Sequence, residues 1–247
     1  MTIEIKTRKV LRYRRGPRII HGLLALSFSI LLLSGLTLLW QPLAGLAAGG
    51  LVRQFHYLGA ILFMAIPVIY LIIDRPAVKE LVWDSFQYDR DDWRWLKQAY
   101  RYFLGYCEGM PPQGRLNAGQ KIHHAGVVIF SATIVGSGLV MWFGKGTLGA
   151  GGLAMAAMIH ILSMLGLTVL LVGHLYFTFV YGALAGMLKG YIPEAEARLE
   201  HAKWVESLPG KAPWIIEVAS TGPADLPNHD VHFGAQAQIR ASTETSQ

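Results

Sequence analysis

Cysteine and charged residues are both scarce in this chain of 247 residues, and each scarcity excludes classes of protein. The single cysteine, Cys107, rules out a disulfide within the chain, a CxxCH haem attachment site, and an iron–sulfur or zinc site built from several cysteines of this chain. Charged residues make up 15% of the sequence, whereas an ordinary soluble domain has about 25%. Because hydrophobic residues reach 53%, the composition indicates a membrane protein.

Four apolar runs, each long enough to cross a bilayer, account for this composition. A spanning helix needs about 20 residues. We therefore predict an all-α fold, an integral membrane four-helix bundle with additional helices on the cytoplasmic surface. Residues 1–190 would form the four-span domain, and residues 191–247 a cytoplasmic surface helix and an extended tail. The predicted spans are about 19–40, 55–73, 122–143 and 153–181.

The distribution of lysine and arginine predicts the orientation of these spans. The connections at 41–54 and 144–152 carry only Arg53 and Lys145, respectively. Nearly all other basic residues lie before residue 19, between the second and third spans, or after the fourth. Cytoplasmic segments are the ones enriched in lysine and arginine, so we predict that both termini are cytoplasmic. The basic N-terminus could resemble a nucleic-acid-binding arm, but beside a span it indicates a membrane anchor.

Four of the six histidines in or beside the predicted spans form pairs, and the orientation predicts their depth. His160 and His174 are 14 residues apart on the fourth span, so they lie on one helix face, about 21 Å apart along the axis. His21 opens the first span from the cytoplasmic side, and His56 opens the second from the opposite side. The four side chains therefore sort into two pairs of matched depth, His56 with His160 and His21 with His174.

Paired histidines on facing helices suit the ligation of haem iron. Neutral imidazole is a good axial ligand, and a bundle core is a usual place for cofactors. Ligation by two histidines fills both axial positions and favours electron transfer, so the pattern predicts two haem b groups. The alternative is that these histidines bond to neighbouring helices or line a proton path.

Small residues on the same helices would leave room for a flat macrocycle, although close helix packing uses such residues equally well. They are Gly22, Ser34, Gly35, Gly59, Gly136, Gly138 and Gly166.

The remaining histidines have no unused partner of matched depth. His123 and His124 lie at the cytoplasmic end of the third span, where we expect them at the interface, near a proton entry route. The other three are expected to be solvated, and the proline-containing tail from Pro209 to be extended or disordered. These three are His201, His229 and His232.

Short motifs give the chain a resemblance to a known family over about residues 12–190. The segment Asn117-Ala118-Gly119-Gln120-Lys121 precedes the third span, Leu33-Ser34-Gly35 lies in the first, and the fourth has the spacing from Ile159-His160 to His174. With the four histidines, these motifs resemble the cytochrome b (gamma) subunit of respiratory formate dehydrogenase. His123-His124 depart from that pattern, because a typical member has apolar residues there. The histidines alone also fit the cytochrome b subunits of nickel–iron hydrogenases and thiosulfate reductases.

The resemblance implies specific binding residues. His56 and His160 would hold the iron of a periplasmic haem b, and the other histidine pair that of a cytoplasmic haem b. Quinone or menaquinone would bind beside the latter, at Asn117, Gly119 and His174. Asn117 could also cap the third span, since asparagine is a good N-cap.

The function implied is that of a membrane-anchoring subunit without catalytic residues for substrate oxidation. It would take electrons from a periplasmic iron–sulfur subunit, and through it from a molybdenum or tungsten catalytic subunit, and deliver them to quinone in a bacterial inner membrane. The equivalent subunit of a hydrogenase or of a thiosulfate or polysulfide reductase stays open as an alternative. A second alternative is a non-redox, proton-linked membrane protein. No nucleic-acid partner is expected.

Overall fold

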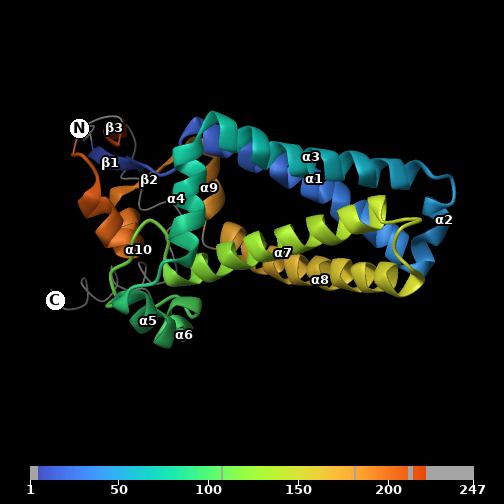
Figure 1. Ribbon diagram of the computed structural model, residues 1–247. Helices are drawn as coiled ribbons and strands as arrows, with labels where there is room; N and C mark the ends of the chain where they lie inside the picture. Colours follow the sequence, from blue (N-terminus) through green and yellow to red (C-terminus); the bar gives the residue numbers. More distant parts are fainter. Residues whose placement is uncertain (1–4, 107, 181, 211–213, 221–247) are drawn as a thin grey trace. The chain divides into compact units, whose positions relative to one another are not determined.

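A computed structural model describes residues 5–106, 108–180, 182–210 and 214–220 (Figure 1). Cys107, His229 and His232 lie outside these residues. Within the described part, four helices are long and apolar enough to cross a membrane, which confirms the predicted all-α membrane fold. They are α1 (Arg15–Leu39), α3 (Leu51–Ile73), α7 (Ala118–Phe143) and α8 (Ala150–Val180).

Shorter helices connect these four and follow the last. Three of them form in the polar segment between α3 and α7. The shorter helices are the 3-10 helix η1 (Gln41–Leu43), α2 (Ala44–Ala47), α4 (Arg75–Phe86), α5 (Arg90–Lys97), α6 (Ala99–Phe103), α9 (Ala183–Lys189) and α10 (Glu194–Ser207).

The chain divides into two compact units. We call the first, Arg15–Val82 with Gly126–Leu170, the helical unit. The second, Met1–Arg14 with Trp83–Ala125 and Leu171–Gln247, is called the mixed unit because it combines helices with a small sheet. The mixed unit collects the three regions that hold most of the lysine and arginine. This grouping agrees with the prediction that they share one side of the membrane.

Close packing in the helical unit depends on small residues. Helices α1 and α3 lie side by side (Figure 1). A Cβ added at Gly59 of α3 would lie 3.1 Å from side-chain carbons of Ile30 and Leu31 on α1. At Gly166 of α8, an added Cβ would lie only 2.6 Å from the ring of Phe130 on α7. These two glycines therefore allow helices to approach closely, which was the alternative to a role beside a macrocycle.

A three-stranded sheet in the mixed unit was not predicted from the sequence. Its order is β2-β1-β3, and both neighbours pair antiparallel to β1 (Ile5–Leu11). Strand β2 (Tyr191–Pro193) pairs along three positions, and β3 (Ile215–Ser220) along six. The partners of β1 are some 200 residues away in the sequence, so no local pattern signals the pairing.

The sheet carries one of the two buried hydrophobic clusters of the mixed unit. Val10 of β1 is fully buried and packs with Ala197, Trp204 and Val205 of α10. Burial of these side chains fixes the described N-terminal strand against α10. The tail after Pro209 is thus partly an ordered strand, and its residues 211–213 and 221–247 lie outside the described ones.

Candidate functional site

An apolar cavity of about 460 Å³ lies in the helical unit, lined by residues of α1, α3, α7 and α8. Two of the four predicted ligands, His56 of α3 and His160 of α8, are among its lining residues. Most of the wall is aliphatic or aromatic. Representative members are Phe28, Leu31, Phe63, Met64, Ile161 and Met164.

The imidazoles of His56 and His160 lie next to each other in the wall of this cavity. Their ring centroids are 6.4 Å apart, and their planes are inclined by 61°. An imidazole nitrogen binds a metal at about 2.0–2.1 Å, so two rings on opposite sides of one iron have centroids roughly 6 Å apart. The observed separation therefore fits axial ligation of a single iron by both residues.

Hydrogen bonds at Nδ1 orient both rings. The Ser34 hydroxyl donates to the Ile30 carbonyl at 2.6 Å, so its oxygen accepts from His56 Nδ1, 2.9 Å away. His160 Nδ1 donates to the Ile134 carbonyl at 3.0 Å, with the Ser137 hydroxyl at 3.2 Å.

A proton held on Nδ1 leaves Nε2 as the nitrogen with a lone pair, which is the tautomer that binds iron. Across the described chain, neither Nε2 has a hydrogen-bond partner. The donor set, its orientation and the cavity thus fit haem b. The two serines were noted only as small residues or not at all, so their bonding role was missed.

Two of the small residues noted in the sequence lie beside the imidazoles. A Cβ added at Gly138 would be 3.2 Å from Cε1 of His160, and one at Gly35 would be 3.6 Å from Cε1 of His56. Both glycines also line the cavity. At Gly22 and Gly136, in contrast, an added Cβ would meet nothing within 4 Å. A side chain at Gly138 would therefore displace the His160 ring by a few tenths of an ångström, whereas one at Gly136 would contact no neighbour.

The second predicted histidine pair is divided between the two units. His21 belongs to the helical unit and His174 to the mixed unit, so their pairing stays a prediction. In the mixed unit, the ring of His123 stacks on that of His174, with centroids 5.7 Å apart and planes inclined by 28°. The His124 ring follows at 5.8 Å from that of His123. This contact of His123 with a proposed ligand was not predicted from the sequence.

Asn117 caps α7, as one reading of the sequence predicts. Its Oδ1 accepts from the Gln120 amide at 2.8 Å, and Gln120 Oε1 accepts from the Asn117 amide at 3.1 Å. Asn117 is 3% exposed. A Cβ added at neighbouring Gly119 would lie 3.1 Å from the ring of Trp95, so the start of α7 is packed closely.

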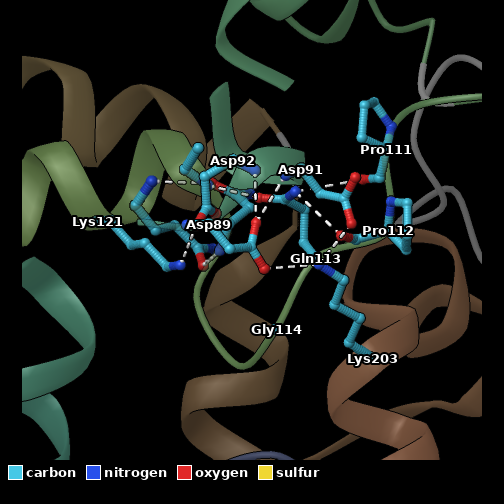
Figure 2. Close-up of polar contacts among 12 residues, drawn as sticks. Asp89, Asp91, Asp92, Pro111, Pro112, Gln113, Gly114, Lys121 and Lys203 are labelled. Atoms are coloured by element: carbon cyan, nitrogen blue, oxygen red, sulfur yellow. Dashed lines mark hydrogen bonds and ion pairs between the residues drawn. The ribbon is translucent and has the colours of Figure 1, made fainter. Parts of the chain in front are cut away.

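A group of aspartates and lysines surrounds this helix start (Figure 2). The buried carboxylate of Asp92 accepts from Lys121 Nζ at 2.6 Å and from the amide of Asp89 at 2.7 Å. Lys203 of α10 contacts Asp89 and Asp91, each at 2.7 Å. Partial burial raises the pKa of Asp89, but the hydrogen bond and charge of Lys203 and the amides of Asp92 and Asp91 outweigh it and lower the pKa to about 2. These bonds fix the positions of α5 and α10 against the beginning of α7.

The prediction that His201 is solvated was wrong. His201 is 3% exposed, its Nδ1 donates to the Gly114 carbonyl at 2.8 Å, and its Nε2 accepts from Arg12 at 3.2 Å. Burial lowers the pKa of His201 well below its ordinary value, and the charges of Arg12 and Arg115 lower it further, against the Gly114 bond. The reason is β1, which brings Arg12 from the N-terminus onto α10.

Comparison with known proteins agrees with this geometry. The sequence profile described as prokaryotic cytochrome b561 matches residues 12–190. The chain is 24% identical over 204 residues to the formate dehydrogenase cytochrome b556 subunit of Haemophilus influenzae, covering 79% of this chain and 82% of that protein. It is 25% identical over 203 residues to the formate dehydrogenase cytochrome b556(fdo) subunit of Escherichia coli K12, covering 79% and 91%, respectively.

Proposed function

Because the chain belongs to the prokaryotic cytochrome b561 family, we propose that it is the membrane-anchoring dihaem subunit of a formate dehydrogenase complex, transferring electrons to quinone. Family membership and the four apolar helices make it a multi-pass bacterial inner-membrane protein. The names of both relatives favour formate dehydrogenase over the hydrogenase and sulfur-compound reductase alternatives.

The observation that carries the proposal is the pair His56 and His160 in their apolar cavity. Haem b bound there would supply reversible one-electron exchange between ferric and ferrous iron. The two imidazoles would occupy both axial positions, which leaves no open position for oxygen chemistry. Ser34 and Ser137 hold the rings in place, and the aliphatic wall excludes water.

The remaining parts of the proposed path rest on the resemblance and on the depth of the histidines. His21 and His174 would hold a second haem b at the cytoplasmic side. An iron–sulfur subunit with a molybdenum or tungsten catalytic partner would supply electrons from the periplasmic side. Inward electron movement with proton uptake inside would charge the membrane, at about 2.3 kcal/mol for each charge that crosses 100 mV.

Quinone would bind at Asn117, Gly119 and His174. The Oδ1 of Asn117 is used in capping α7, so its amide nitrogen is the atom that would donate to a quinone carbonyl. Asn117→Asp separates these two roles, because aspartate also caps a helix but lacks the amide donor. We expect this variant to keep both haems and to reduce quinone slowly. Unchanged quinone reduction would refute the assignment of Asn117.

A haem count on the purified chain tests the proposal directly. We expect two haem b per wild-type chain by pyridine haemochrome, both reducible by quinol. His160→Ala should lose one of them, whereas Met158→Ala, an exposed position on the same helix, should lose none. A folded wild-type preparation without haem would refute the electron-transfer function and would favour the alternative that the histidines line a proton path.

A further inference from the structure

Two cations stand out among the lining residues of the haem cavity. Arg53 and Lys145 both line it, and the lining residues include no aspartate or glutamate. They are also the only lysine and arginine in the connections 41–54 and 144–152. Both side chains are exposed, and at the edge of an apolar cavity they are suited to pair with a ligand that brings negative charge.

Arg53 and Lys145 lie on the same side of the histidine pair. Arg53 is three residues before His56 on α3, so it shares a helix face with His56, about one turn nearer the start of the helix. Lys145 follows the end of α7, seven residues beyond Gly138, the glycine beside the His160 ring. Both cations are therefore displaced from the imidazoles toward the α2–α3 and α7–α8 connections.

A tight turn positions Lys145. The amides of Leu148 and Thr147 donate to the Gly144 carbonyl at 2.9 and 3.2 Å, respectively. Gly146 has φ +89°, a conformation that favours glycine. A Cβ added at Gly144 would lie 2.5 Å from the Val140 carbonyl oxygen, so that position also excludes a side chain. The sequence of this turn thus determines the backbone position of Lys145.

In the described part of the chain, neither cation has a protein counterion. Among the described residues, no hydrogen bond or ion pair involves the side chain of Arg53 or Lys145. The sequence contains no acid between Glu4 and Asp74, nor between Glu108 and Glu194. The only acids of the helical unit, Asp74 and Glu80, follow the far end of α3 from Arg53. The helical unit therefore offers no carboxylate at this end of the cavity.

We propose that Arg53 and Lys145 bind the two propionate carboxylates of the haem held by His56 and His160, an inference that rests on the proposed function. Haem b carries both carboxylates on one edge, and that edge then faces the α2–α3 and α7–α8 connections. The guanidinium of Arg53 suits a two-pronged contact with one carboxylate, and Lys145 acts as a point charge on the other.

This arrangement also adjusts the redox behaviour of the site. Positive charge near the iron disfavours the ferric state, which carries one more positive charge than the ferrous state. Removing a cation therefore lowers the reduction potential of this haem. The effect of one charge across a partly buried distance corresponds to roughly a three- to tenfold change in the equilibrium constant for reduction, and tenfold is 59 mV for one electron.

The experiment is an optical redox titration of the purified full chain in detergent. Wild type should show two haem b components. Arg53→Gln and Lys145→Gln should each lower the potential of one component by a three- to tenfold change in its equilibrium constant, and the double variant should lower it further. The other component should stay unchanged. Arg53→Lys keeps the charge and should retain most of the potential.

Lys79→Gln is the matched control, since it removes an exposed cation of the same unit that does not line the cavity. It should leave both components unchanged. If wild type has two haems and neither Arg53→Gln nor Lys145→Gln changes a haem potential, this inference alone is overturned. If the same variants lose binding of the partner subunit while the potentials stay unchanged, the two cations serve docking. A folded wild-type chain without haem would overturn the proposed function, and this inference with it.

Discussion

Replacing Gly138 with alanine tests whether the gap beside His160 determines the position of its ring. The added Cβ would lie 3.2 Å from Cε1 and 3.5 Å from Nδ1 of His160. Carbon atoms prefer separations of about 3.5–4.0 Å, so the ring must retreat by a few tenths of an ångström. That movement acts against the bond from Nδ1 to the Ile134 carbonyl, which is 3.0 Å long.

The expected cost can be estimated from this geometry. Weakening one hydrogen bond and displacing an axial ligand should cost about 1 kcal/mol of haem binding. Since 1.4 kcal/mol is a factor of ten, haem affinity at this site should fall roughly fivefold. Replacing glycine by alanine within a helix otherwise stabilises the fold by about 0.5–1 kcal/mol, so the protein itself should still fold.

Transfer of haem to excess apomyoglobin measures this loss. Gly136→Ala is the control on the same helix, because its Cβ would meet nothing within 4 Å. We expect one of the two proposed haems to leave Gly138→Ala about fivefold faster than wild type, and neither to leave Gly136→Ala faster. Gly35→Ala, whose Cβ would lie at an ordinary 3.6 Å from His56 Cε1, should lie between them. Identical behaviour of Gly138→Ala and Gly136→Ala would refute the reasoning.

Two further predictions concern the mixed unit. Because burial lowers the pKa of His201 in the folded state, its neutral form stabilises the fold above pH 6.5, and this contribution is lost as the pH falls below 6.5. The free energy of unfolding of wild type, measured by thermal unfolding, should fall by up to about 1.4 kcal/mol per pH unit below pH 6.5. His201→Phe should reduce this dependence on pH. An unchanged dependence would contradict the assignment. Lys121→Met leaves the 2%-exposed Asp92 carboxylate without its cation and should cost about 3–5 kcal/mol. Lys203→Met, which frees the more exposed Asp89 and Asp91 carboxylates, should cost about 1 kcal/mol, so equal losses in thermal unfolding would refute the distinction.

The long helices could be predicted because hydrophobicity over about 20 residues is a local property of the sequence. The same holds for the pairing of His56 with His160, since helix rise and loop charge together determine depth. The structure brings these two rings to 6.4 Å, as the depth argument expects. The Asn117 cap was also visible as a local pattern of asparagine followed three residues later by glutamine.

What could not be predicted depends on contacts between distant segments. The burial of His201 follows from Arg12, which lies 189 residues earlier in the chain. The serine contacts of His56 and His160 join positions 22 and 23 residues apart on different helices. A glycine's role likewise depends on the facing helix: Gly136 and Gly138 are indistinguishable in sequence, yet only the second meets an imidazole.

The pairing of β1 with β3 also sets the order of events on the ribosome. Thr7 and Val218 bond across 211 positions, and all four membrane helices are encoded between them. At about 5–20 residues per second, the first strand waits roughly 10–40 s for its main partner. The sheet can close only after the fourth span has left the ribosome. Closure of the sheet therefore marks a chain whose four membrane helices have all been synthesised, and a nascent chain stalled before residue 215 has a free N-terminal strand edge.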